Sequence, residues 1–337
     1  MIAIVFFCLI QNNSINFENI VNKNLVELPD FSIDEFLQNK PYWALLHPST
    51  IINNTRPLTY HLSSVLFTNI SGKGAIRIKD EDSILVLEHN TFCSISSSFE
   101  GGCIYFLPGH SIYQKDICAR NVYSNIKANY GFINISQTSE NINYVSMISL
   151  CDCNSMPSIN DMIWLGGGVS SISNYNSTNN YVFASPGFYM GYSVGSGNAS
   201  FINVLSATAK SNSIVYLFSN CDIKYSNFYR NNVTDKLGYY LVAIENKCSA
   251  DHCVFAYNSA QNFLNAIKFQ FSDCSFYQNS INTAPPSIQY VGSYSFVVNT
   301  QCHMWNNKYL FKNYSCVIQY FTMDSLIFSF SIFILFT

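Results

Sequence analysis

Residues 248–260, CSADHCVFAYNSA, place Cys248, His252 and Cys253 within six positions of one another. Two thiols and an imidazole at this spacing are part of a zinc ligand set, so the stretch first suggests a metal site. Neighbouring residues of a β-strand point to opposite faces, however, which leaves His252 and Cys253 poorly placed to share one ion. We therefore looked for the same pattern elsewhere in the chain.

The core of this stretch recurs as C/S-x-Φ-x-x-N, where Φ is apolar and successive copies begin 27, 21 and 28 residues apart. Residues one and three of the pattern face the same side of a strand, so we expect them in the interior. We expect the Asn at a corner, in left-handed conformation, with its amide stacked on the Asn of the next copy. The copies are Ser226, Phe228 and Asn231; Cys253, Phe255 and Asn258; Cys274, Phe276 and Asn279; and Cys302, Met304 and Asn307.

Short apolar strands follow the same rhythm. In the N-terminal half they begin with glycines 28 and 29 residues apart, in GAIRI (Gly74), GCIYF (Gly102) and GFINI (Gly131), and similar strands continue downstream at MIWL (162–165) and IVYLF (214–218). A period in the twenties indicates a solenoid whose turns stack about 4.8 Å apart around a shared apolar interior. The sequence therefore predicts an all-β parallel β-helix of roughly ten turns.

The chain divides into four predicted segments. Residues 1–14 are interpreted as a signal peptide, with a buried first strand as the alternative. Residues 15–62 form an N-terminal cap with a short helix at the Ser32-x-x-Glu35 capping box. Residues 63–315 form the β-helix, with Gly/Ser/Asn-rich surface loops around 165–200. The apolar tail 316–337 is open to four interpretations: a marginal membrane anchor, a cleaved lipid-anchor signal, a truncated transmembrane helix or a last buried strand.

The amino-acid composition limits the classes of function that the chain can have. Charged residues make up 11% of the 337 residues, against about 25% in typical soluble domains, and Asn and Ser supply much of the polar surface. The net charge of −3 without a basic cluster excludes nucleic acid as a partner. Sequons compatible with a secreted glycoprotein occur at Asn12, Asn53, Asn69, Asn134, Asn176, Asn198, Asn232 and Asn313.

Cysteines at equivalent positions of adjacent turns, such as Cys253 and Cys274, are close enough either to form disulfides or to remain as a reduced, packed column. Their alignment with the repeat, rather than with a ligand set, favours a structural role. We expect no metal, no cofactor and no catalytic residue.

The strands that follow a Φ-x-x-N corner resemble the repeats of polymorphic outer-membrane proteins and of Asn- and Cys-rich surface β-helix families of protists. FEGGCIYF (99–106) and NISGKGAI (69–76) carry the resemblance. It implies a right-handed, pectin-lyase-like β-helix and, by analogy, a secreted or cell-surface role in adhesion or antigenic display. The expected partner is a glycan or protein of a host or cell surface, with membrane attachment through the C-terminal tail.

The alternative is a carbohydrate-active β-helix, a polysaccharide lyase or glycoside hydrolase. Arg77 and Lys79 in RIK resemble a substrate-binding tripeptide of polygalacturonases, but the acidic segments that precede it in those enzymes are missing. The acidic run 80–82 is interpreted as a charged turn. Three further acids fall at different phases of the repeat and are not expected to meet on one face, namely Asp222, Asp251 and Asp273. A non-enzymatic role is therefore preferred.

Overall fold

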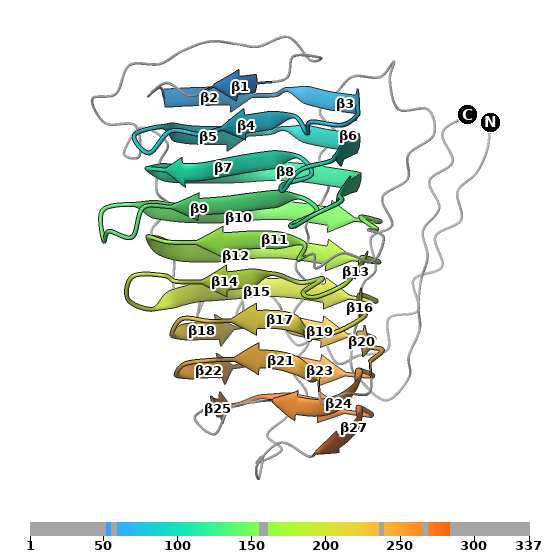
Figure 1. Ribbon diagram of the computed structural model, residues 1–337. Helices are drawn as coiled ribbons and strands as arrows, with labels where there is room; N and C mark the ends of the chain where they lie inside the picture. Colours follow the sequence, from blue (N-terminus) through green and yellow to red (C-terminus); the bar gives the residue numbers. More distant parts are fainter. Residues whose placement is uncertain (1–51, 55–58, 155–160, 236–238, 265–268, 284–337) are drawn as a thin grey trace, which may run out of the picture. The chain divides into compact units, whose positions relative to one another are not determined.

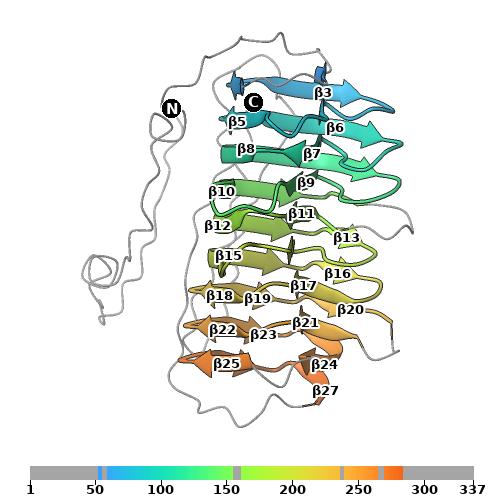
Figure 2. The ribbon, with the colours of Figure 1, turned by 60° about the vertical axis from the view of Figure 1, so that its left-hand side comes forward.

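A computed structural model describes residues 52–54, 59–154, 161–235, 239–264 and 269–283, all within the compact unit Tyr42–Thr337. These residues form a parallel β-solenoid of about seven turns, and its strands stack along one axis (Figures 1 and 2). Every named strand pair is parallel, as the repeat predicted. The turn count is slightly below the expected ten, and the copy at Cys302, Met304 and Asn307 lies outside the described residues.

Two sheets make up the wall of the solenoid. The 14-stranded sheet, called sheet A, contains β2 (Thr59–Ser63), β3 (Leu66–Ile70), β5 (Ile84–Glu88), β6 (Thr91–Ser97), β8 (Ser111–Ser124), β10 (Ile142–Cys151), β12 (Val169–Thr178), β15 (Gly197–Leu205), β18 (Cys221–Lys224), β19 (Asn227–Tyr229), β22 (Cys248–Asp251), β23 (Val254–Ala256), β25 (Phe269–Ser272) and β26 (Ser275–Tyr277).

The 13-stranded sheet, called sheet B, faces the viewer in Figure 1. It contains β1 (Ile52–Asn54), β4 (Ile76–Ile78), β7 (Ile104–Gly109), β9 (Gly131–Ile135), β11 (Ile163–Gly166), β13 (Tyr181–Val182), β14 (Tyr189–Gly191), β16 (Thr208–Ala209), β17 (Ser213–Leu217), β20 (Asn232–Val233), β21 (Tyr240–Ile244), β24 (Ser259–Leu264) and β27 (Ser280–Thr283).

The interior is filled by columns of apolar side chains from equivalent positions in successive turns. Cys253 and Phe255 are both fully buried, as their spacing predicted. Phe255 lies between Phe228 and Phe276, with ring centroids 4.9 and 5.1 Å away and nearly parallel planes. Because strand pairing sets the turn-to-turn spacing, identical aromatic residues in one column stack face to face.

Left-handed residues recur along the solenoid in pairs that are five positions apart. They lie in strands of sheet A or directly beside them, at corresponding places, and none is β-branched, the class for which this conformation is most strained. The nine pairs are 64 and 69, 89 and 94, 116 and 121, 147 and 152, 174 and 179, 201 and 206, 225 and 230, 252 and 257, and 273 and 278. We call these two columns the first and second corners.

The left-handed residue lies one position before the Asn that was predicted to adopt this conformation. At the second corner Tyr257 has φ 56°, whereas Asn258 follows it and points inward, 1% exposed. Asn258 Oδ1 accepts from the Asn231 backbone N–H of the preceding turn at 3.0 Å, and Asn258 Nδ2 donates to the Phe228 carbonyl at 2.8 Å. The side chain thus bonds two backbone groups beside the kink of the preceding turn, a role that requires a side chain with both a donor and an acceptor.

The same bridge recurs at both corners. Asn180, Asn231 and Asn279 make it at the second corner. At the first corner Asn90 makes it between the Val65 N–H and the Leu62 carbonyl, and Cys274 replaces the amide with its thiol. The first residue of the C/S-x-Φ-x-x-N pattern and its final Asn therefore each come directly after a left-handed residue.

The segment 165–200 differs from the predicted surface loops. Val169–Thr178 is β12, which pairs with β10 on one side and β15 on the other. Its inner face combines the fully buried Ile172 and Tyr175 with the buried Ser170 and Ser177, whereas Ser171, Asn174 and Asn176 are only partly buried. A polar-looking sequence therefore still forms a strand with one buried face. The predicted cap helix at 32–37 lies outside the described residues, and β1 and β2 fall within the range 15–62 assigned to the cap.

Replacing Asn258 by Ala should lower the free energy of unfolding by about 1–3 kcal/mol, because buried backbone groups lose their partners. The matched control is Asn232→Ala, whose side chain is exposed, with an expected change within about 0.5 kcal/mol. Urea unfolding followed by circular dichroism measures both. Equal midpoints for the two variants would show that the amide bridge does not stabilise the stack.

Candidate functional site

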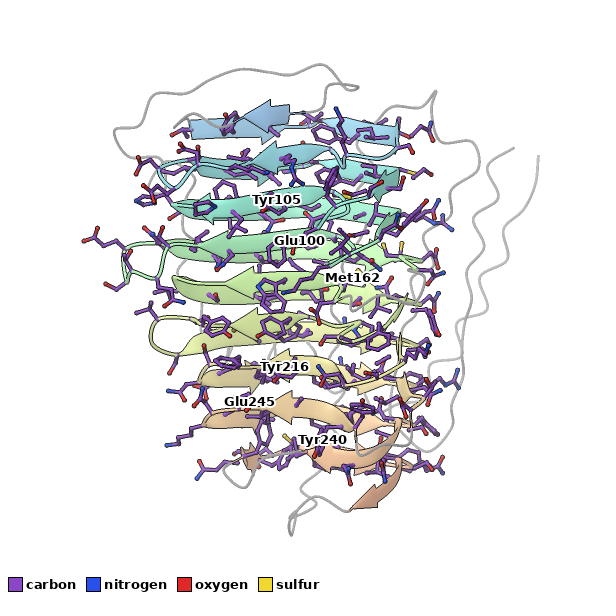
Figure 3. The ribbon with its side chains drawn as sticks, in the orientation of Figure 1. Glu100, Tyr105, Met162, Tyr216, Tyr240 and Glu245 are labelled. Atoms are coloured by element: carbon purple, nitrogen blue, oxygen red, sulfur yellow. The ribbon has the colours of Figure 1, made fainter. Side chains whose placement is uncertain are left out.

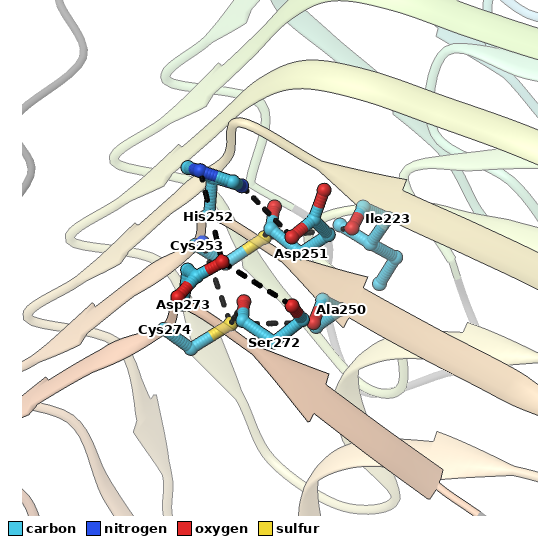
Figure 4. Close-up of polar contacts among 8 residues, drawn as sticks. All are labelled: Ile223, Ala250, Asp251, His252, Cys253, Ser272, Asp273 and Cys274. Atoms are coloured by element: carbon cyan, nitrogen blue, oxygen red, sulfur yellow. Dashed lines mark hydrogen bonds and ion pairs between the residues drawn. The ribbon is translucent and has the colours of Figure 1, made fainter. Parts of the chain in front are cut away.

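The Cys248, His252 and Cys253 group does not converge. Cys248 and Cys253 are buried in the interior, whereas His252 is the left-handed residue of a first corner and its ring lies partly exposed outside (Figure 4). Burial raises the pKa of the Cys253 thiol well above its usual value, so this sulfur is a packed neutral group. The inward cysteine and outward histidine predicted from the sequence are confirmed.

Asp251 and Asp273, two of the three acids expected to lie on different faces, both approach the His252 ring. His252 Nδ1 lies 2.8 Å from Asp251 Oδ1, and His252 Nε2 lies 3.9 Å from Asp273 Oδ2 of the next turn (Figure 4). The phases of Asp251 and Asp273 in the repeat differ by one residue, but the corner turns both side chains toward the ring between them. Asp222 stays apart, in register with Ser249.

The most extended side-chain array lies on the outer face of sheet B. One outward position in each turn is aromatic over five turns, in register through the strand pairing of β7, β9, β11, β14 and β17. We call this column the aromatic ladder: Tyr105, Phe132, Trp164, Tyr189 and Tyr216. Its centroid separations are 5.9, 5.7, 3.6 and 5.0 Å from one ring to the next.

The ladder presents ring edges and a few accessible rings. Tyr105, Phe132 and Tyr189 are 6–8% exposed, while Trp164 and Tyr216 are partly exposed. Beside its lower end, Tyr192 is 47% exposed and its ring lies 4.4 Å from that of Phe218. Figure 3 shows Tyr105 and Tyr216 on the same side of the solenoid, with Glu100 and Glu245 near them.

Cationic groups cover parts of the ladder. The Arg77 guanidinium lies 4.1 Å from the Tyr105 ring centre and 4.8 Å from that of Phe99. Lys127 Nζ lies 3.3 Å from the Trp164 ring centre. These distances are in the range of cation–π contacts. Arg77 of the RIK tripeptide thus extends the ladder column by one turn, in register with Tyr105, rather than lying beside acidic catalytic residues.

Acidic groups lie along the same face. Tyr216 donates its hydroxyl hydrogen to Glu245 Oε1 at 2.6 Å. Burial raises the pKa of Asp161 to about 6, opposed by the positive charge of Lys127. Burial also lowers the pKa of Lys127, with Asp161 and Glu100 acting in the opposite direction. The ladder therefore carries Tyr hydroxyls, cations over the rings of Tyr105, Phe132 and Trp164, and carboxylates at its margin.

The sequons differ in accessibility. Asn69 and Asn232 are exposed, whereas Asn134, Asn176 and Asn198 are partly buried. The amide of Asn176 is occupied, since its Nδ2 donates to Ser149 Oγ and its Oδ1 accepts from Thr178 Oγ1. Asn53 lies in β1, and Asn12 and Asn313 lie outside the described residues.

The acidic run 80–82 forms a turn, in which Asp80 Oδ1 accepts from the Asp82 backbone N–H and the Ser83 hydroxyl. Cys253 and Cys274 are free thiols buried in adjacent turns.

Sequence reasoning missed the ladder although it found most of its strands. GCIYF, GFINI, MIWL and IVYLF each contain one rung. The signal was the aromatic residue between two apolar ones in each strand, which strand alternation places outside. The ladder was hidden because Gly131 pairs with Ile104 and not with Gly102. An alignment of the repeats by their glycines therefore does not bring the aromatic residues into register.

No protein-family model, curated protein or solved structure matches the chain. Within the described ranges, no helix has the length and apolar character needed to cross a membrane.

The Asp161 carboxyl predicts a pH dependence. Its pKa is about 6 in the fold against an ordinary 3.8, so the native state keeps the proton to higher pH than the unfolded chain. Its contribution to stability is therefore complete below pH 3.8 and is lost as the pH rises through 6.

The unfolding free energy of the natural chain relative to Asp161→Asn should fall by roughly 2–3 kcal/mol between these limits. Denaturant unfolding of both proteins at several pH values measures the difference. A difference that does not change with pH would contradict a buried, protonated Asp161.

Proposed function

We propose that the chain is a non-enzymatic, secreted or surface-displayed β-solenoid that binds an extended glycan along the aromatic ladder. The observation that supports this proposal is the continuity of the ladder over five turns, with Trp164 and Tyr216 accessible within it. A polymer lying along the axis would meet a similar group at each turn, about every 4.8 Å. Weak contacts repeated in this way add up through a high effective concentration.

The chemistry of the ladder suits a hydroxyl-rich ligand. Tyrosine and tryptophan combine an apolar ring with a polar edge, which suits sugars, whose surfaces also alternate C–H and O–H groups. Lys127 and Glu245 supply a donor and acceptor beside the rings. The carboxylates at the margin, Glu100, Asp161 and Glu245, balance the cations Arg77, Lys79 and Lys127, so a neutral glycan is favoured over a strongly charged one.

Location is part of the proposal. The apolar N-terminal stretch, the sequons and the low charge fit a chain that enters the secretory route. We propose adhesion or antigenic display at a cell surface, with the C-terminal tail as the means of attachment. Accessible Asn69 and Asn232 fit a glycosylated surface.

A carbohydrate-active enzyme is the second candidate, and Asp161 is the observation that favours it. A carboxyl group whose pKa is raised to about 6 has the property of a general acid. Asp161 is buried, however, at 3% exposure, which favours a structural carboxyl over one that meets a substrate.

Glycan binding is tested with the purified chain on an array of neutral and charged oligosaccharides. Trp164→Ala should weaken binding by about tenfold, the equivalent of roughly 1.4 kcal/mol of lost ring contact. The matched control is Tyr181→Ala, an aromatic residue 43% exposed on β13 outside the ladder, which should leave binding unchanged.

Equal loss in both variants, or no retained glycan at all, would overturn binding at the ladder. Release of shortened oligosaccharides that Asp161→Asn abolishes would favour the enzyme. Unfolding midpoints of the variants distinguish lost contacts from lost fold.

Glycan attachment gives a separate test of the secretory route. When the chain is expressed with a secretion signal in eukaryotic cells, peptide mass spectrometry should find glycans at Asn69 and Asn232 but not at Asn176, because the Asn176 amide is hydrogen bonded within the stack. If Asn69 and Asn232 stay unmodified in the secreted protein, the prediction that these exposed side chains accept glycans is wrong.

A further inference from the structure

We propose that Asp251, His252 and Asp273 form a binding site for a divalent first-row transition-metal ion, with Zn²⁺ as the best match. Among the residues that the structure describes, these three form a group in which each offers one ligand atom and all three atoms lie within 4.8 Å of one another. The site is independent of the aromatic ladder, because it lies on the first corner of sheet A (Figure 4).

The corner geometry assembles the site from two turns. His252 and Asp273 occupy the same column, both left-handed, with φ 52° and 49°. This conformation turns their side chains outward, one above the other. Asp251 is the last residue of β22 and approaches the ring from its own turn. Ligands from consecutive turns therefore meet without any loop.

The distances suit an ion better than a second hydrogen bond. The 3.9 Å gap between His252 Nε2 and Asp273 Oδ2 is too long for a hydrogen bond. Two ligands on one ion, each with a bond of about 2.0–2.2 Å, lie about 3.4 Å apart in tetrahedral geometry, so a small side-chain rotation closes the gap. The 2.8 Å contact between Asp251 Oδ1 and His252 Nδ1 holds the second carboxylate against the ring, with the three ligand atoms within 4.8 Å of one another.

Charge and donor type indicate the class of ion. Lys224 is in register with Asp251, so with a neutral imidazole the group of four carries one net negative charge. Tyr225 of the preceding turn packs against the His252 ring at 5.3 Å and restricts it. One imidazole with two carboxylates is a ligand set for Zn²⁺ and related ions, whereas Ca²⁺ and Mg²⁺ prefer oxygen ligands alone.

The chain contains a matched pair that lacks the third ligand. His89 and Asp116 occupy the same column in earlier turns, with His89 Nδ1 3.1 Å from Asp116 Oδ2. Glu88, the counterpart of Asp251, instead contacts His61 at 3.1 Å. The same corner without a free third carboxylate is therefore available as an internal control.

The test is a titration of the full chain with Co²⁺, whose visible absorption reports nitrogen and oxygen ligands and whose thiolate bands would reveal binding at cysteines instead. We expect one saturable site without thiolate bands, displaced by Zn²⁺ and not by Ca²⁺. His252→Asn and Asp273→Asn should each weaken binding by about tenfold or more; asparagine tolerates the left-handed conformation, so these variants should fold.

The control variants His89→Asn and Asp116→Asn should leave the Co²⁺ affinity unchanged. The proposal is overturned if no saturable binding is seen, if thiolate bands account for it, or if the control variants lose affinity as much as the site variants. Glycan binding of His252→Asn is expected to be unchanged, which keeps this test separate from the proposed function.

Discussion

The left-handed corners are the constraint on which this solenoid depends. Where an Asn follows the left-handed residue, its side-chain amide bonds a backbone N–H and a carbonyl of the preceding turn; at other corners a buried apolar residue such as Ile148 or Ile202 follows instead. Asn258 bonds the N–H of Asn231 and the carbonyl of Phe228 from one turn to the next. Without such a bridge the buried backbone groups would cost about as much as several apolar contacts supply.

The bends also explain where function can be placed. Because the two corners recur at fixed positions, every outward column continues in register through the turns. One outward column on sheet B consists of aromatic residues and forms the aromatic ladder. A short part of the first-corner column places the carboxylates of Asp251 and Asp273 beside the His252 imidazole. Both arrays join residues of different turns: the ladder takes one residue from each turn, and the second array joins Asp251 and His252 to Asp273 of the next turn, a spacing that strand stacking converts into contact.

The repeat shows how far sequence reasoning reached. The pattern C/S-x-Φ-x-x-N predicted the parallel stack and the interior positions of Cys253 and Phe255, whereas the face-to-face stacking of Phe228 and Phe255 was seen only in the structure. It misplaced the left-handed residue by one position, since a tyrosine gives no sign of that conformation and only the preceding turn shows what the Asn amide bonds. It also interpreted β12 as part of a surface loop, because Ser residues occupy inner as well as outer positions of this strand and conceal the alternation.

The sequence by itself determined the architecture, because strand alternation and a period in the twenties leave few other ways to bury the apolar positions. The candidate sites were decided only by the tertiary structure. Gly131 pairs with Ile104, a register that no local pattern specifies, and that register aligns Tyr105 with Phe132. Likewise Asp251 and Asp273 occupy positions of the repeat that differ by one residue, so the sequence places them on different faces. The left-handed corner nevertheless turns both side chains toward His252.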